Sequence, residues 1–389
     1  MLDSKDIEIL LTFQAYPLAT ASFISEKINM SISGTIARIN RLIDENGAFR
    51  SVFVDLDNAA LDLEIHDFLF KVNNLKSLKI LEDIFCYNHP YVSYRGRCNG
   101  YYSGLHLQFR IPKGGLKYLT EIAELLGKKG IIQSYEYVER VQDEKSVRIK
   151  SALSCWNSND STWSFDWEKW RKGFRNSKAT SLKIETENKS VLEQLDYTDI
   201  QLLAQLTMDG RTKNSTMMKN LGIENDSGVK QKIGRKVSFL KENTIKDYHI
   251  VLNNTVFDLY QSVIFRGNCG IDIARKLRNY LVKNQNDYEK SLIEKTDISP
   301  DVAIFPFSGL FFITENGFIW YVSAPPKHLS DLTNFMLDIC PQHNLFIVDQ
   351  KYAQNYGLWD QTYDPKTKKW RVDKEFMIDN IMKEICKAM

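Results

Sequence analysis

The chain of 389 residues carries one long pattern twice. Residues 2–10, which begin Leu-Asp-Ser-Lys-Asp-Ile, return at residues 195–203 as Leu-Asp-Tyr-Thr-Asp-Ile, 193 positions later. Residues 163–166 (Trp-Ser-Phe-Asp) are matched in the same way by residues 370–373 (Trp-Arg-Val-Asp). Solenoid repeats run over about 20–50 residues, so this is a duplicated multi-module protomer. We expect the two copies to pack as an intramolecular pseudo-dimer through their sheets, with further homo-oligomerisation left open.

Each copy opens with the pattern of three helices and a strand. In the first copy the helices are expected at 4–15, after Thr20, and after a cap at Ser31 or Ser33, with a strand at 51–56. The third helix has an apolar side that we expect to face inward: Ile32, Ile36, Ile39, Leu42 and Ile43. In the second copy the corresponding ranges are 198–208, 214–221, 227–243 and 247–252. Three short helices before a strand predict a winged helix-turn-helix, although a plain three-helix core has the same pattern.

The rest of each copy alternates strands and helices in the order β-α-β-β-α-β, which predicts a ferredoxin-like domain. The expected elements of the first copy are 67–72, 74–86, 91–97, 102–111, 114–127 and 131–139. Those of the second copy are 258–265, 270–283, 301–307, 310–323, 326–340 and 344–350. A Trp-containing segment follows each domain, and we expect it to form a β-hairpin that buries its Trp and lengthens the sheet.

The predicted fold class is therefore α+β, as two tandem copies of a winged helix-turn-helix, a ferredoxin-like domain and a Trp-containing hairpin. The expected domains are a winged helix-turn-helix at 1–58, a ferredoxin-like domain at 59–150 and an extension with linker at 151–190; then a second winged helix-turn-helix at 191–254, a second ferredoxin-like domain at 255–355 and a second extension with a C-terminal helix at 356–389.

Bulk composition narrows the classes of function. Hydrophobic content of 43% and charged content of 26% are ordinary for a globular domain, and no apolar run reaches the length of a membrane span. The six cysteines lie far apart without a Cys-x-x-Cys pair, so we expect neither a zinc site nor a disulfide framework. We expect a cytoplasmic protein with no metal, no cofactor and no membrane partner.

Several motifs resemble the leucine-responsive/AsnC family of transcriptional regulators. The second copy carries Leu195-Asp196-x-x-Asp199-x-x-Leu202-Leu203 and then Asp209-Gly210-Arg211, as that family does at its opening. The first ferredoxin-like domain carries the family's Asn99-Gly100-Tyr101-Tyr102 hairpin. The resemblance covers most of both copies, and it implies a helix-turn-helix that binds DNA and a ferredoxin-like domain that binds a small effector. The chain departs from the family in having two copies and the Trp-containing extensions, and its first copy lacks the Asp-Gly-Arg turn.

Basic residues concentrate around the second helix-turn-helix. Between Arg211 and Lys246, nine basic side chains stand against three acidic ones, a net charge of +6 on a chain whose total is +2. Projecting residues 227–243 as a helix places Gln231, Arg235 and Ser238 opposite the apolar side, flanked by Lys230 and Lys232. Arg and Gln can read base edges and Lys suits phosphates, so these residues with Arg211 are the candidate DNA contacts. A merely solvated basic face would have the same composition.

The first helix-turn-helix is much less basic. Between Ala21 and Arg50 its net charge is +1. Its candidate DNA contacts are Ser33, Thr35, Arg38 and Arg41. The two copies therefore either bind unlike half-sites or leave the first largely structural, and we expect binding to depend more on the second.

One sheet face offers a candidate effector or interface site. In residues 102–111, Leu105, Leu107, Phe109 and Ile111 alternate with polar residues, so the apolar set should face the helices. The polar set, His106, Gln108 and Arg110, should then line the other face, as an anion site or as an interdomain network.

The sequence favours a DNA-binding regulator, and we expect no enzyme. It has no Gly-rich phosphate loop, no metal-ligand cluster and no nucleophile elbow. An enzymatic alternative is a siroheme-decarboxylase-like protein, since those enzymes resemble the same two modules and bind a tetrapyrrole through His and Arg. His106, Arg95, Arg97 and Arg110 are the residues that could do so here. A scaffold that binds no DNA is the third alternative.

Overall fold

The computed structural model describes residues 2–44, 47–141, 144–183, 189–223, 226–296 and 302–389. The chain forms two compact units. The first unit contains residues 1–52, 140–185 and 249–350, and the second contains 53–139, 186–248 and 351–389. Each unit therefore combines segments from both sequence repeats.

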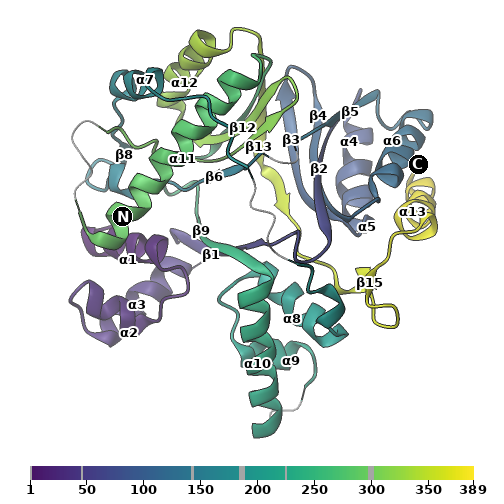
Figure 1. Ribbon diagram of the computed structural model, residues 1–389, viewed down its shortest axis with the longest axis horizontal. Coiled ribbons are helices and arrows are strands. Elements are labelled where there is room, and N and C mark those ends of the chain that lie inside the picture. The colour runs from purple at the N-terminus through teal and green to yellow at the C-terminus, as the bar shows by residue number, and fades with distance from the viewer. Residues whose placement is uncertain (1, 45–46, 142–143, 184–188, 224–225, 297–301) are drawn as a thin grey trace. The chain divides into compact units, whose positions relative to one another are not determined.

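The three-helix segments are present in both copies (Figure 1). The first head, in the first unit, consists of α1 (Ser4–Ala15), α2 (Ala21–Lys27) and α3 (Ile32–Ile43). The second head, in the second unit, consists of α8 (Tyr197–Met208), α9 (Asn214–Asn220) and α10 (Ser227–Asn243). These bounds agree with the sequence prediction to within a residue or two.

Repeated local signals explain where these helices begin. Asp3 caps α1 by accepting from the Asp6 backbone N–H, while the Asp6 carboxylate accepts from the Asp3 N–H. Asp196 and Asp199 form the same reciprocal capping box at the start of α8. Such boxes satisfy backbone donors that a helix start leaves without partners. The Asp-x-x-Asp spacing shared by the two repeats is thus a structural signal.

Each head is followed by a strand: β1 (Phe49–Leu56) after α3 and β9 (Ile245–Leu252) after α10. The two strands form a two-stranded sheet, so one repeat's strand pairs with the other's. Within the first unit, the Asn253 N–H donates to the Ala48 carbonyl at 2.9 Å. Within the second, the Asp57 N–H donates to the Thr244 carbonyl at the same distance.

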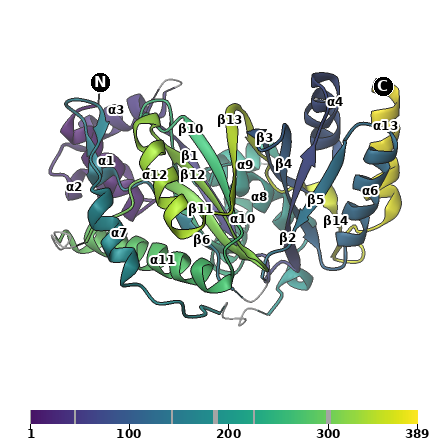
Figure 2. The same ribbon diagram turned by 90° about the horizontal axis from the view of Figure 1, so that it is seen from above.

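The second unit contains the first ferredoxin-like domain. Its strands are β2 (Leu63–Lys71), β3 (Val92–Gly100), β4 (Gly104–Pro112) and β5 (Ser134–Val138), in the sheet order β5-β2-β4-β3. Helical residues 75–88 comprise α4 (Leu75–Ile80), a π-helical turn (Leu81–Phe85) and α5 (Cys86–Asn88). They cover one sheet face together with α6 (Leu116–Lys128) (Figure 2). The predicted β-α-β-β-α-β order is confirmed here.

The first unit contains the second ferredoxin-like domain. Its strands β10 (Gln261–Gly267), β11 (Ser308–Thr314), β12 (Gly317–Ala324) and the part of β13 (His343–Asn355) up to residue 350 have the order β13-β10-β12-β11. Its helices are α11 (Ile271–Glu294) and α12 (Pro326–Ile339). The short strand β6 (Val147–Ile149) from the first repeat pairs with β11. Three expectations were wrong: α11 runs well beyond residue 283, residues 302–307 form no regular strand, and residues 310–323 are not one strand but are divided between β11 and β12.

The Trp-containing segments form the expected hairpins. They are β7 (Trp156–Asn157) with β8 (Thr162–Trp163), and β14 (Tyr363–Asp364) with β15 (Lys369–Trp370). Each hairpin is a separate two-stranded sheet, so the expectation that it would lengthen the main sheet was wrong. Both strands of each hairpin are only two residues long, and side-chain contacts rather than ladder hydrogen bonds attach it to its unit.

Each hairpin docks beside the first strand of the other repeat's ferredoxin-like domain. The Trp163 indole Nε1–H donates to the Phe257 carbonyl at 2.6 Å, a few residues before β10. The Trp370 indole donates to the Leu61 carbonyl at 2.6 Å, just before β2. The two Trp residues are 4% and 5% exposed. Burial of both rings agrees with the sequence prediction, and the contacts show that the two repeats exchange their extensions.

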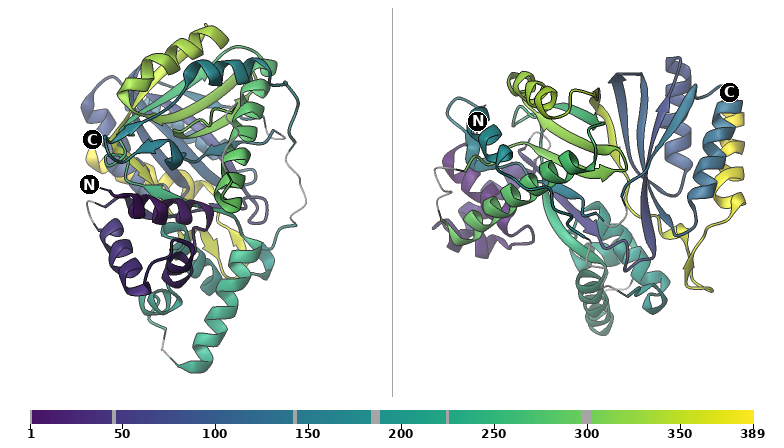
Figure 3. Two further views of the ribbon diagram at one scale, coloured as in Figure 1. Left: turned by 90° about the vertical axis from the view of Figure 1, so that its left-hand side faces the viewer. Right: turned by 45° about the horizontal axis from the view of Figure 1, so that its top comes forward.

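The helices that follow the hairpins complete this exchange. In the first unit, α7 (Trp167–Arg175) buries Trp170 against Tyr280 of α11 and Phe335 of α12, with ring centroids 5.2 and 4.6 Å away. In the second unit, α13 (Asn380–Ala388) and the π-helical residues before it lie beside α6 (Figure 3). The domain cores therefore contain residues from both repeats, and the fold is the predicted α+β class.

Candidate nucleic-acid interface

Helix α10 presents one polar and one apolar side. Ile233, Val237 and Leu240 are at most 4% exposed and pack in the core of the second head. The opposite side is exposed and contains the residues predicted from the sequence: Lys230, Gln231, Lys232, Arg235 and Ser238. Because α10 is 17 residues long, its exposed side can lie along a major groove.

Most cations on this side are available to a ligand. Among the described residues, Lys230, Lys232 and Arg235 make no ion pair. Lys236, on the flank of the helix, is different: its Nζ lies 2.8 Å from carboxylate oxygens of both Asp196 and Asp199. Lys236 therefore fastens α10 to the start of α8, while its exposed neighbours can meet phosphates. Arg211 lies half-buried in the turn between α8 and α9, where its backbone N–H donates to Asp209.

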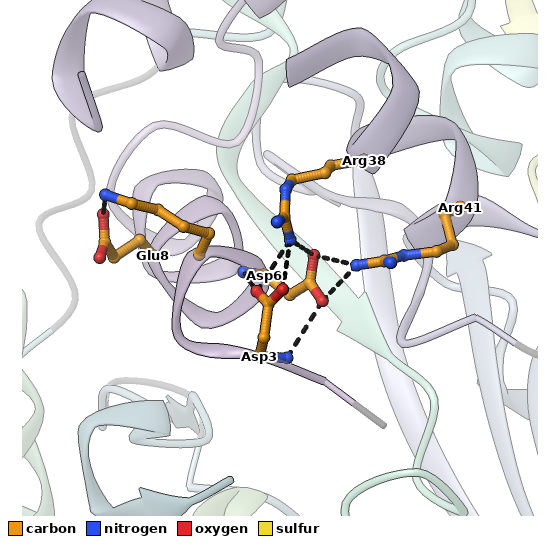
Figure 4. A network of polar contacts seen from close by, with 6 residues as sticks. Asp3, Asp6, Glu8, Arg38 and Arg41 are labelled. Carbon is orange, nitrogen blue, oxygen red and sulfur yellow. Dashed lines mark hydrogen bonds and ion pairs between the residues drawn. The ribbon is translucent and has the colours of Figure 1, made fainter. Parts of the chain in front are cut away.

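Helix α3 of the first head uses its arginines differently (Figure 4). Arg38 contacts Asp3 at 2.7 Å and Asp6 at 2.9 Å, and Arg41 contacts Asp6 at 2.5 Å. The Asp6 side chain is fully buried, so it needs these partners. The hydrogen bond from Arg38 holds the pKa of the Asp3 carboxyl below its ordinary value. Both predicted arginines therefore neutralise carboxylates of their own head.

The other two predicted contacts of the first head differ in exposure. Ser33 is exposed, with its Oγ 3.4 Å from the Oγ of Ser31, which is the residue that caps α3. Thr35 does not stand beside the outward face as expected. It is fully buried, and its hydroxyl donates to the Ser31 carbonyl at 3.0 Å.

The prediction of which residues of α3 face inward was wrong in part. Ile39 and Leu42 are buried with Thr35, but Ile32, Ile36 and Ile43 are 51%, 43% and 43% exposed. The ion pairs of Arg38 with Asp3 and Asp6 fix the rotation of α3 and turn the side of Thr35, Ile39 and Leu42 inward. Three isoleucines are thus left on the surface of this helix.

The candidate site on the first ferredoxin-like sheet is largely closed. Leu105, Leu107 and Phe109 do face the helices. On the other face, His106 is 2% exposed, and its Nε2 lies 2.9 Å from Oδ1 of the buried Asp67. Gln108 donates to the same oxygen at 3.3 Å, and Arg110 is half-buried on the same face.

The four residues considered for a tetrapyrrole do not share one face. Arg95 and Arg97 pair across the sheet with Leu107 and Leu105, whereas His106 pairs with Gly96. Residues opposite each other in antiparallel strands point to the same side, so Arg95 and Arg97 lie on the helix side and His106 on the other. Arg97 is engaged there by Glu82 at 2.6 Å and stacks on the Tyr352 ring at 3.4 Å. This arrangement does not bring the four together around one ligand.

Sequence reasoning missed the ion pairs between the first and third helices of each head. The signal was present: both repeats have Asp-x-x-Asp at the first helix and a basic residue, Arg38 or Lys236, at matching positions of the third. Among the residues that the structure describes, no group of His, Cys, Asp and Glu is arranged to hold a metal ion. None of the described helices is long and apolar enough to cross a membrane.

Comparison with known proteins found a family model that matches part of the chain. Residues 2–46 match the family model described as winged helix-turn-helix DNA-binding. No curated protein matches the chain. The siroheme decarboxylase NirDL, in complex with an iron-uroporphyrin III analogue, is 12% identical over 99% of each chain, with a TM-score of 0.49.

Two regulators are similar to part of the chain. A transcriptional regulator from Neisseria meningitidis in complex with L-Met is 20% identical over 36% of this chain and 92% of its own, with a TM-score of 0.28. The leucine response regulatory protein LrpA of Mycobacterium tuberculosis is 13% identical over 35% and 90%, with a TM-score of 0.24. The family match covers the first head, a winged helix-turn-helix, and the order of elements in both repeats resembles the leucine-responsive/AsnC transcriptional regulators.

Proposed function

We propose that this protein is a transcriptional regulator that binds double-stranded DNA through the second head, with α10 in the major groove. The observation that carries the proposal is the exposed side of α10, where Lys230, Lys232 and Arg235 make no ion pair among the described residues. A helix fits the major groove, Lys and Arg neutralise phosphates, and Arg and Gln can bond base edges bidentately. Gln231 and Arg235 are the proposed base-reading residues.

Structure at the start of α10 supports this assignment. The Asp226 side chain caps the helix by accepting from the Gly228 N–H. Lys230, Gln231 and Lys232 then lie in the first two turns, where recognition helices contact bases. Lys236 holds the helix on the head through Asp196 and Asp199, which orients these exposed side chains without using their charges.

We propose that a small effector or an interdomain contact modulates binding through the sheet face of His106, Gln108 and Arg110. The buried pair of His106 and Asp67 makes this a preorganised polar site, and a ligand there must exchange contacts with it. Packing of the two copies as a pseudo-dimer remains a prediction. The tetrapyrrole alternative is disfavoured by the placement of Arg95 and Arg97 across the sheet from His106.

The test is to mix the purified full chain with sheared genomic DNA, recover the bound fragments and sequence them. Enrichment of discrete fragments, each retarded by the protein in a gel and released by added salt, is the expected result. The matched comparison is Lys232→Ala with Arg235→Ala against Lys172→Ala with Arg175→Ala on α7, which removes the same charge elsewhere. Loss of enrichment in both double variants, or no retention by the natural chain, would contradict the proposal.

A further inference from the structure

The third helices of the two heads can be compared residue by residue. Arg38 of α3 and Lys236 of α10 occupy the same place, because each bonds to the capping-box carboxylates of its own head. With this register, the buried Thr35, Ile39 and Leu42 match the buried Ile233, Val237 and Leu240. The two helices therefore present equivalent positions outward.

At those outward positions the charges of the two helices differ. Lys230, Gln231, Lys232 and Arg235 of α10 correspond to residues of α3 that carry no charge: Ile32, Ser33, Gly34 and Ala37. Lys241 corresponds to Ile43. No position that is cationic in this outward set of α10 is cationic in α3.

The two arginines of α3, Arg38 and Arg41, already form ion pairs within the first head. Withdrawing Arg38 and Arg41 towards a phosphate would leave the buried Asp6 carboxylate without its cationic partners. An uncompensated buried carboxylate is strongly destabilising. The exposed Ile32, Ile36 and Ile43 would meanwhile meet a phosphate backbone to which they offer no hydrogen bond.

We infer that only α10 reads DNA, so that each chain recognises a single half-site although it contains two winged helix-turn-helix heads. This inference rests on the proposed function. It implies that an operator with two half-sites recruits two chains. The first head thus has the three-helix fold of the second but lacks the exposed cations of α10.

Positions 37 of α3 and 235 of α10 are equivalent, so the same substitutions can be compared at both. The affinity of each variant for a DNA duplex from the enriched fragments is measured by fluorescence anisotropy. A carboxylate inserted into a groove repels phosphates, so Arg235→Glu should bind at least about tenfold more weakly than Arg235→Gln. Ala37 is exposed and outside the groove in this account, so Ala37→Glu should bind within about twofold of Ala37→Gln. Circular dichroism checks that all four variants are folded.

A weakening for Ala37→Glu as large as that for Arg235→Glu would overturn the single-half-site inference and leave the DNA-binding function standing. Saturation of a two-half-site duplex by one chain, measured by sedimentation, would overturn it as well. No duplex binding by the natural chain would instead refute the proposed function itself. One chain per half-site, with position 37 insensitive to charge, is the expected outcome.

Discussion

The exchanged Trp hairpins give the sharpest prediction about stability. Trp163 and Trp370 are each about 95% buried, and each indole N–H donates to a backbone carbonyl at 2.6 Å. Replacing such a Trp with Ala removes the packed ring and opens a cavity, which costs about 3–5 kcal/mol of unfolding free energy. Removal of the hydrogen bond alone, with the carbonyl left buried, costs about 1–3 kcal/mol.

These two contributions can be separated. Trp163→Phe and Trp370→Phe keep an aromatic ring and delete the N–H, so each should lose about 1–3 kcal/mol, less than the Ala variant at the same position. Tyr87, which is 67% exposed, supplies the control, since Tyr87→Ala should change the free energy by about 0.5 kcal/mol or less. Urea unfolding followed by circular dichroism measures all five. Ala variants that unfold at the natural midpoint would refute the claim that each hairpin stabilises its unit.

Three further predictions follow from the heads and the buried histidines. Burial lowers the pKa of His89 to about 3, so below pH about 6.5 the unfolded chain takes up a proton that the folded chain excludes. Unfolding free energy should therefore fall as pH falls from about 6.5 towards 3, with a smaller slope in His89→Phe, and urea midpoints at several pH values check this. Asp6→Ala should destabilise the first head by about 2 kcal/mol, because it removes half of a capping box and both arginine contacts, while leaving DNA affinity nearly unchanged in an anisotropy titration. Arg38→Gln and Arg41→Gln should likewise weaken DNA binding less than Arg235→Gln does, and a larger effect of the α3 variants would reverse the assignment of the heads.

Local signals made the heads predictable. Thr20, Ser31, Asp3 and Asp196 are side chains that cap helices, and each does so in the structure. The alternation in β4 also predicted correctly which residues face the helices. These features depend on neighbours a few residues away, which the sequence displays directly.

The elements that were mispredicted depend on distant contacts. The last turns of α11 contain Asn284, Gln285 and Tyr288, polar residues that are typical of a helix end but are buried here. Asn284 donates to the Ala303 carbonyl, and Tyr288 donates to Gln14 of the first head at 2.6 Å. These partners are 19 and 274 residues away in the chain, so the local sequence does not show that the helix continues past residue 283.

The same limit applies to the candidate site. The exposed side of α10 followed from periodicity, because the buried positions there are all aliphatic. On α3, isoleucines occur on two sides, and only the ion pairs of Arg38 decide which side is buried. The exchange of hairpins between repeats also depends on which carbonyl each indole meets, and no local pattern encodes that choice.

The salt dependence of DNA binding tests the central claim most directly. The logarithm of the association constant should fall linearly with the logarithm of salt concentration, with a slope of about 0.9 for each phosphate contact. Lys232→Ala with Arg235→Ala should weaken binding and flatten this slope by roughly one unit for each phosphate that the variant no longer neutralises, whereas Lys172→Ala with Arg175→Ala should leave it unchanged. Equal slopes for the natural chain and the α10 variant would show that α10 does not meet the DNA backbone.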